Sequence, residues 1–491
     1  MSPSKRVLVR LAAAASVLAL GACTTVGPNF KQPAAPAGAS ASGYAMAGDP
    51  AAPGVTLSPE ARSAGPWWEA FGSPELNAVV RQALADSPTL AEANATLERA
   101  HAQYRAARGQ QLPQLDANAG YNRERINIQA FGFTGFSAGI TNPTIDLYSV
   151  GGAVAYDLDI FGGRRRTTEE AGARAEYEAH RADAAYLSLS GSVALQVMRI
   201  ASLRAEIAAV ESIIADDERV LDLVRKSTRA GGEAPAAIDT GSAQLAEDQA
   251  LAPPLYRELD IARHQLALLV GKAPAEWSPP DFDFAKMTAP TTIPVSLPSS
   301  LIRTRPDILA AEADLHASTA AVGVATANLY PDIRLSANLT QSAIDPSDLF
   351  NTSLASGWAI GPGLTAPIFH GGTLRAQKRA AEADARASLA RYQQTVLRAF
   401  TEVSDLLAAL GTDQQSIAAL QRAVTASEAS ARNAQTAYSL GGGTLLQVTD
   451  AERQLSRTRR SLVAAQGQMY ADLVQLYAAT ATDWRPAASS T

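Results

Sequence analysis

Two long stretches of the chain contain no proline, and their length excludes a compact fold. No proline lies between Pro143 and Pro235, or between Pro367 and Pro486. Within both stretches, apolar residues recur with the three–four spacing of supercoiled helices. A helix over residues 165–229 would be roughly 95 Å long at a rise of about 1.5 Å per residue. Helices of this length belong to extended coiled coils, not to a single globular core.

The apolar spacing also predicts how these helices pack. In the first long helix it runs from Leu203 to Val224 and is broken only at Asp217, and in the second it runs from Leu389 to Leu410. A sustained seam of this kind predicts left-handed supercoiled helix pairs. The seam residues are Leu203, Ile207, Val210, Ile214, Leu221 and Val224 in the first helix, and Leu389, Tyr392, Val396, Ala399, Val403, Leu406 and Leu410 in the second.

The chain is an internal duplication with a period of about 210 residues. Pro88 and Pro113 recur as Pro306 and Pro331, with the same separation of 25 residues. The segment "LDIFGGRRR" is answered by "APIFHGGTLR" in the second half. The two expected structural repeats cover residues 63–280 and 281–485.

Each repeat contains two short segments in which apolar and polar residues alternate. In "SGWAIGPGLTAPIF", Trp358, Ile360 and Leu364 fall on one side. This period is typical of a transmembrane β-strand, and equally of a soluble hairpin with one wet face. Four spanning strands would leave two open edges, so several chains would have to close a barrel. The expected strands lie at about 114–126, 150–161, 332–343 and 355–369.

Glycines interrupt the helical pattern once in each repeat. Glycine accepts the positive φ needed where one helix ends and the next begins. Thr444, with Gln447 three residues on, predicts a capping box for the returning helix, and Pro235 suits the first turn of its counterpart. We therefore expect coiled-coil hairpin tips at residues 230–236 and 441–444. Their turn residues are Gly231, Gly232, Gly441, Gly442 and Gly443.

The amino terminus resembles a bacterial lipoprotein signal. Residues 1–22 combine a basic start with a short apolar stretch and end in "LGA", directly before Cys23, the only cysteine. In such signals the cysteine becomes the lipidated first residue, and Thr24 rather than Asp after it favours the outer membrane. Residues 23–62 are rich in Pro, Ala and Gly and predict a tether. Residues 486–491 are expected to be a disordered tail.

The composition argues against several classes of function. The net charge of −6 and the lack of a basic stripe do not suggest nucleic-acid binding. The segment "GFSAG" fits a nucleophile-elbow motif around Ser137, but no helix pattern follows it. The five histidines form no triad and no metal-ligand spacing. We expect no enzyme activity, no cofactor and no metal.

Motifs along most of the chain resemble the outer-membrane factor family. They are "CTTVGPNFKQP", "WWEAFGSPEL", "DLDIFGGRRR", "RTRPDILAAEADL", "ANLYPDIRLSANL" and "APIFHGG". The resemblance is to TolC-like efflux lipoproteins of the nodulation-protein subgroup. It implies an α+β membrane protein: a homotrimer with a 12-stranded transmembrane β-barrel, four strands per chain, continued by a coiled-coil α-helical barrel through the periplasm. It also implies a passive duct, served by a periplasmic adaptor at the hairpin tips and an inner-membrane pump.

The resemblance assigns a periplasmic gate to the second hairpin. Leu446 and Asp450 match an apolar and an acidic residue that ring the threefold axis, and Arg453 matches a basic residue that ties neighbouring helices. Tyr438 matches an aromatic residue that helps to lock the closed state. A second acidic ring of some relatives falls on Gln447, which would make this gate less acidic and less prone to cation block.

Alternative interpretations remain at this point. Asp450 could serve only the helix dipole, and for Asp239, its counterpart in the first repeat, we favour that structural role. The chain could also be a conduit for type I protein secretion. A third possibility is a non-conducting lipoprotein scaffold that spans the periplasm. The sequence identifies neither the exported compound nor the partner pump and adaptor.

Overall fold

The structure is a computed structural model that describes residues 25–34, 44, 56–57, 66–126, 144–288, 290, 292–293 and 298–480. The expected signal peptide, Cys23, Ser137 and the tail at 486–491 lie outside these residues. Two compact units are distinguished. The first comprises Met1–Gln32, Leu97–Tyr177 and Glu312–Arg391, and the second comprises Pro33–Thr96, Glu178–Ala311 and Tyr392–Thr491.

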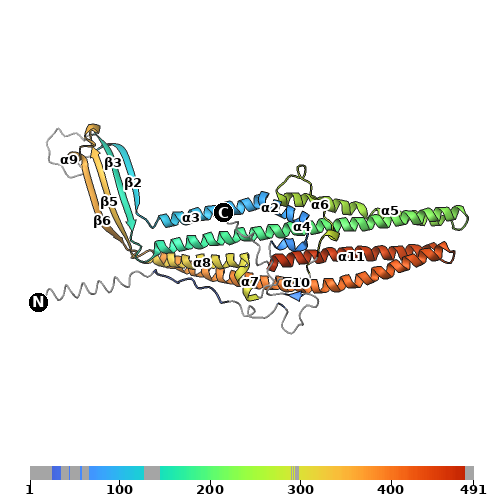
Figure 1. The fold of residues 1–491 in the computed structure, drawn as a ribbon. Helices are drawn as coiled ribbons and strands as arrows, with labels where there is room; N and C mark the ends of the chain where they lie inside the picture. The colour runs from blue at the N-terminus through green and yellow to red at the C-terminus, as the bar shows by residue number, and fades with distance from the viewer. Residues whose placement is uncertain are drawn as a thin grey trace. The chain divides into compact units, whose positions relative to one another are not determined.

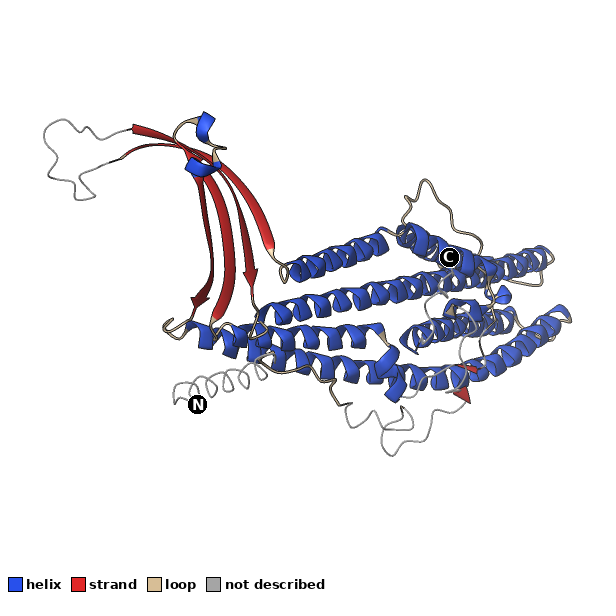
Figure 2. Ribbon diagram, turned by 60° about the vertical axis from the view of Figure 1, so that its left-hand side comes forward, coloured by secondary structure: helices blue, strands red, loops and turns tan. Residues whose placement is uncertain are grey.

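A four-stranded antiparallel sheet forms one part of the first unit (Figure 2). Its strands are β2 (Gln114–Arg125), β3 (Thr144–Asp157), β5 (Asp332–Ala343) and β6 (Ser356–Thr365), in the order β2-β3-β5-β6. The hairpin of the first repeat therefore pairs with that of the second through β3 and β5. Among the described strands, β2 and β6 each have one neighbour, so the sheet has two open edges.

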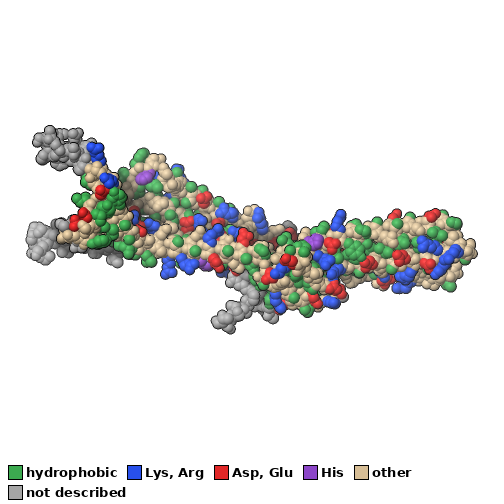
Figure 3. All heavy atoms as spheres, turned by 90° about the horizontal axis from the view of Figure 1, so that it is seen from above, with side chains coloured by type: hydrophobic (Ala, Val, Ile, Leu, Met, Phe, Trp, Pro, Cys, Tyr) green, Lys and Arg blue, Asp and Glu red, His purple; other side chains and the backbone are tan. Residues whose placement is uncertain are grey.

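The register separates the two faces of the sheet. Leu115, Val154, Ala337 and Ile360 form one row across all four strands, and the next row contains Asp116, Ala153, Asn338 and Ala359. Because side chains alternate along a strand, one face is largely apolar, and the other is polar or small except at Ile145 and Leu147 of β3. Figure 3 shows hydrophobic side chains gathered over the strands. Residues of the apolar face that are at least 38% exposed are Leu115, Tyr121, Val154, Leu335, Leu339, Trp358, Ile360 and Leu364.

Two strand boundaries differ from the sequence prediction. The strand expected at 150–161 begins earlier, at Thr144, and ends at Asp157, because the backbone then turns through positive φ at Asp159 (36°) and Gly162 (78°). The strand expected at 355–369 ends at Thr365, two residues before Pro367, which has no N–H to donate to a ladder.

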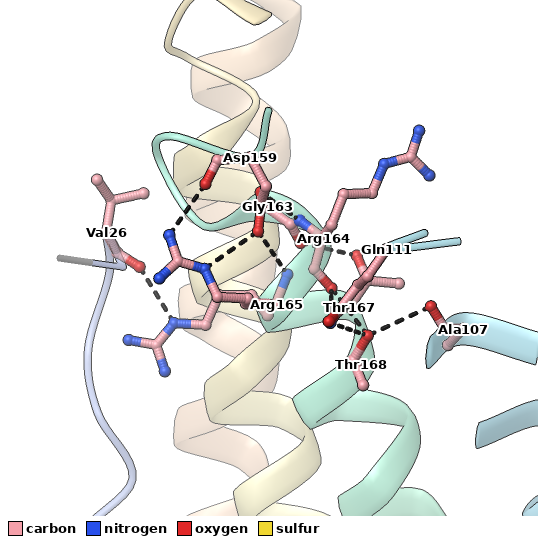
Figure 4. Close-up of polar contacts among 10 residues, drawn as sticks. Val26, Ala107, Gln111, Asp159, Gly163, Arg164, Arg165, Thr167 and Thr168 are labelled. Atoms are coloured by element: carbon pink, nitrogen blue, oxygen red, sulfur yellow. Dashed lines mark hydrogen bonds and ion pairs between the residues drawn. The ribbon is translucent and has the colours of Figure 1, made fainter. Parts of the chain in front are cut away.

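The "GGRRR" segment forms the junction at which β3 gives way to helix α4 (Gly163–Arg229). Asp159 accepts hydrogen bonds from the backbone N–H groups of Arg164 and Arg165 at 2.8 and 2.9 Å, which caps the new helix. The Arg164 guanidinium pairs with Asp157 at 2.5 Å. The Arg165 guanidinium pairs with Asp159 at 3.2 Å (Figure 4). These two arginines therefore serve the junction within the chain.

The expected tether at 23–62 is not free along its whole length. Arg166, whose side chain is 3% exposed, donates to the carbonyl oxygens of Val26 and Gly27 and, at 2.6 Å, to Oδ1 of Asn29. Gly27 adopts a φ of 88°, and a Cβ there would lie 2.6 Å from the Gly323 backbone. Phe30 stacks on His316 with ring centroids 4.5 Å apart. The Pro-rich composition failed to predict this docking because the partners lie far along the chain.

Two helices of 67 residues dominate the chain, and each turns back at a glycine tip (Figure 1). Helix α4 is followed by α5 (Ala236–Gln249) and α6 (Ala252–Val270), whereas α10 (Thr373–Ser439) is followed by one helix, α11 (Leu445–Thr480). The remaining α-helices are α2 (Pro74–Asp86), α3 (Pro88–Gly109), α7 (Pro298–Thr304), α8 (Pro306–Ala327) and α9 (Thr352–Ala355). Short 3₁₀ helices cover Trp67–Phe71, Phe284–Lys286 and Pro346–Asp348, and β1 (Thr56–Leu57) pairs in parallel with β4 (Thr292–Ile293).

The second unit has an aromatic core built from the "WWEAF" segment. Trp67, Trp68 and Phe71 are at most 2% exposed, and Trp67 stacks on Tyr477 of α11. The same hydrophobic cluster includes residues of α2, α4, α6 and α10, so that several helices share one core. Leu203 and Leu410 mark its furthest extent toward the two tips along α4 and α10.

Among the helices that the structure describes, none has the length and apolar character needed to cross a membrane.

We expect Arg166→Ala to release residues 25–32 from their place against helices α4 and α8. The substitution leaves two backbone carbonyls without their donor, at a cost of about 1–3 kcal/mol. Hydrogen exchange of residues 26–31 and limited proteolysis would report the release. Arg174→Ala, which removes an exposed arginine of α4 that pairs with Glu170, serves as the control. Equal protection of the segment in both variants would show that Arg166 does not hold it.

Candidate functional site

Both glycine tips lie in the second unit and close in the same way. Gly231 and Gly441 have φ values of 80° and 77°. The Gly232 N–H donates to the Ser227 carbonyl, and the Gly442 N–H donates to the Ala437 carbonyl, each at 2.9 Å. Hydrogen bonds that close a six-residue turn in this way are typical of the Schellman motif at the C-terminus of a helix. Each long helix therefore stops at a defined residue, and six residues at the first tip and five at the second separate it from the next helix.

The predicted capping box is present at the second tip. The Thr444 N–H donates to Oε1 of Gln447 at 3.0 Å, and the Gln447 N–H donates to the Thr444 hydroxyl at 3.3 Å. Gln447 is therefore engaged in capping and lies one turn before Asp450. At the first tip, Pro235 lies at the cap position, one residue before the helix that we expected it to begin.

Leu446 and Asp450 lie one turn apart on α11 and share an exposed face of the isolated chain. Leu446 is 66% exposed, and the Asp450 side chain is 63% exposed. On other faces of the same turns, Val448 and Glu452 are buried. The helix therefore packs on one side and presents a leucine and a carboxylate on the other.

The alternative role of Asp450 at the helix dipole receives little support. Asp450 is the sixth residue of α11, beyond the first turn in which the dipole acts. Asp239, in contrast, lies in the first turn of α5, where a carboxylate stabilises the helix. The two acidic residues thus occupy different electrostatic positions despite their corresponding places in the repeats.

Arg453 connects α11 to the hairpin of the first repeat. Its Nε donates to Oε1 of Gln244 on α5 at 2.5 Å, and its guanidinium lies 3.9 Å from the Asp450 carboxylate. A charged donor in a partly buried position makes one of the stronger kinds of hydrogen bond. Arg453 therefore joins the two hairpins within one chain and also lies beside the exposed carboxylate.

Tyr438 faces a groove of about 780 Å³ between the two tips. Its hydroxyl is buried beside the side chains of Ser227 and Glu233, and its geometry to the described residues is not that of a regular hydrogen bond. Burial raises the pKa of Tyr438, and the Ser227 hydroxyl opposes this. The groove is lined by, among others, Arg219, Leu223 and Ser227 of α4, Gln435 of α10, and Leu445 and Val448 of α11.

The sequence did not predict a cluster of carboxyl groups next to Arg453. Asp217 of α4, which interrupts the apolar seam, contacts Asp248 of α5, and burial followed by this contact raises the pKa of Asp217 to about 7. Gln244 donates to Asp248 at 2.5 Å, and Gln435 donates to Glu452 at 2.5 Å. The break at Asp217 was the only signal in the sequence, since its partner lies 31 residues further along.

A second carboxyl pair lies within the other hairpin. Asp413 of α10 contacts Asp472 of α11, and burial followed by this contact raises the pKa of Asp413 to about 6. Gln468 donates to Asp472 at 3.0 Å. In the described ranges no His, Cys, Asp and Glu side chains are grouped so as to hold a metal ion.

Comparison with known proteins shows the family to which the chain belongs. The family model described as outer membrane efflux protein matches residues 79–272 and 297–482. The chain is 31% identical over 429 residues to the pyoverdine export outer membrane protein OpmQ of Pseudomonas aeruginosa, with 85% of this chain and 87% of that protein covered. It is 31% identical over 481 residues to the solvent efflux pump outer membrane protein SrpC of Pseudomonas putida, with 96% and 97% covered.

The solved structure of the outer-membrane channel OprN has the same fold. The TM-score is 0.82 at 29% sequence identity, over 94% of this chain and 100% of that chain. The family resemblance inferred from the sequence motifs is confirmed. The chain belongs to the outer membrane efflux protein family and is an outer-membrane component of an efflux system.

Proposed function

We propose that the chain forms a gated homotrimeric duct that carries small molecules across the outer membrane. The observation that supports this best is the sheet with one apolar face, one polar face and two open edges. Three such sheets joined at their edges would form a twelve-stranded barrel with every edge paired. The apolar face would then contact lipid, and the polar face would line the water-filled path. A non-conducting scaffold would need neither face.

The strand–helix junction is proposed to lie at the inner surface of the membrane. Phe161 and Tyr330 stack there with centroids 4.7 Å apart, and aromatic residues favour the membrane–water interface. Thr25 packs against Gly162 at the same place. Cys23, two residues earlier, can reach no further than about 7 Å from Thr25. An acyl chain on Cys23 would therefore enter the lipid beside the barrel.

The second hairpin is proposed to form the gate. Leu446 and Asp450 lie on an exposed face, and three copies around an axis would place a leucine ring above a carboxylate ring. An apolar constriction resists water, and like charges near one axis destabilise the closed state unless a cation or a basic group compensates. Arg453, 3.9 Å from Asp450, supplies such a group.

The partners are proposed to meet the chain at the glycine tips. The groove between the tips exposes Leu223 and is lined on several sides by helix ends, so it could accept the end of another helical hairpin. A periplasmic adaptor would supply that hairpin at Gly231–Gly232 and Gly441–Gly443. An inner-membrane pump bound to the adaptor would supply the energy and select the substrate.

The decisive experiment is single-channel conductance of the purified, lipidated protein in planar bilayers. We expect a small conductance for the wild type and a severalfold larger one for Leu446→Ala combined with Asp450→Ala, because both rings are removed. Leu440→Ala with Asp239→Ala removes an exposed leucine and an acidic residue from the tips without touching the proposed rings. Conductance absent from all variants, despite verified trimers, would favour the scaffold. If the conductance increases only in the Leu440→Ala and Asp239→Ala control, Leu446 and Asp450 do not form the gate.

A second test addresses the connection made by Arg453. Arg453→Ala removes a charged hydrogen bond to Gln244 that is worth about 1.5–3 kcal/mol. We expect faster hydrogen exchange at the start of α11 and a conductance between those of the wild type and the double variant. Unchanged exchange and conductance would contradict the role of Arg453. Arg432→Ala, which removes an exposed arginine of α10, is the matched control.

A further inference from the structure

Two carboxyl groups meet in the seam between the helices of the first hairpin. Asp217 projects from α4 and Asp248 from α5, and Oδ2 of Asp217 is buried without any donor among the described residues. Two carboxylates cannot donate to each other, so their contact becomes a hydrogen bond only when one of them carries a proton. The geometry therefore contains a place for one proton.

The surroundings of the pair favour keeping that proton. The charged and polar groups that face it are Glu452 and Arg453 of α11 and Gln244 of α5. Glu452 disfavours a second negative charge, whereas Arg453 favours it. Arg453 is already engaged with Gln244 and Asp450, so it neutralises the pair only in part.

We propose that Asp217 and Asp248 share a proton that locks the first hairpin, and that loss of this proton loosens the tip and so opens the proposed gate. This inference rests on the function proposed above. With the proton bound, α4 is joined to α5, and α5 is joined to α11 through Gln244 and Arg453. Without it, two like charges face each other in a half-buried seam, and the joint between α4 and α5 weakens.

The direction of the pH dependence follows from the raised pKa of Asp217, about 7 against 3.8 for the ordinary group. The unfolded or opened seam releases its proton at lower pH than the closed seam does. The closed state is therefore most stable below about pH 4 and loses stability as the pH rises through about 7. The tip should be tighter in acid than in neutral or alkaline solution.

The shared proton can be measured directly. Infrared spectroscopy of the purified full-length protein should show a protonated-carboxyl band that disappears with a midpoint near pH 7, where the Asp217 pKa lies. This component should be absent from Asp217→Asn and from Asp248→Asn. Asp222→Asn, which removes an exposed carboxylate of α4 paired with Lys226, should retain it. If the band is unchanged in both seam variants, the shared proton does not exist.

Conductance tests the link to the gate. The wild-type value should rise severalfold between about pH 5 and about pH 8.5, whereas Asp217→Asn should stay low throughout, because its amide can donate to Asp248 at every pH. Asp450→Asn should keep the midpoint, which separates the seam from titration of the exposed carboxylate ring. If the conductance of Asp217→Asn rises with pH as much as that of the wild type, the proposed link between the shared proton and the gate is wrong. No conductance in any variant, with the infrared titration intact, would overturn the duct but not the proton.

Discussion

The backbone groups on the outer edges of β2 and β6 set the strongest constraint on this protein. Alternate residues along β2 (twelve residues) and β6 (ten residues) present backbone groups that no other described strand pairs. In water these groups form hydrogen bonds with solvent, but in hydrocarbon each group left without a hydrogen bond costs several kcal/mol. A sheet with an exposed apolar face therefore cannot enter lipid as a single chain. Insertion, assembly and formation of the path are one event in the proposed trimer.

The junction below the sheet follows from the same constraint. Where β3 ends, its polar backbone must pass directly into a helix without leaving unpaired groups, and the Asp159 carboxylate caps the first turn of α4 for that purpose. Arg166 then fixes residues 26–29 beside the junction. The position of the amino-terminal segment is thus tied to the point where the strands end, and the orientation of an anchor on Cys23 would be tied to it as well.

The sequence predicted the features that depend on local periodicity. The long helices, the four strands, the turn at Gly441 and the capping box of Thr444 follow from spacing alone. The end of β3 at Asp157 was missed because the turn after it places a non-glycine residue, Asp159, at positive φ. The docking of Val26 was missed because its partner, Arg166, lies far along the chain. The pair of Asp217 and Asp248 was missed for the same reason: each aspartate is ordinary in its own segment, and only the hairpin register brings them together.

The positions of buried polar atoms that lack hydrogen-bond partners indicate where the molecule can move. The hydrophobic cluster of the second unit reaches Leu203 and Leu410, and beyond these residues the hairpins depend on narrower seams. Four buried polar atoms without partners in the described chain, on Asp217, Thr228, Asp413 and Tyr438, lie in those distal parts. Replacing buried polar groups by apolar ones is often neutral or stabilising, so a seam selected only for strength would contain none. Regions that move are drawn from the less stable parts of a fold, and these distal seams are where the proposed gate would have to move.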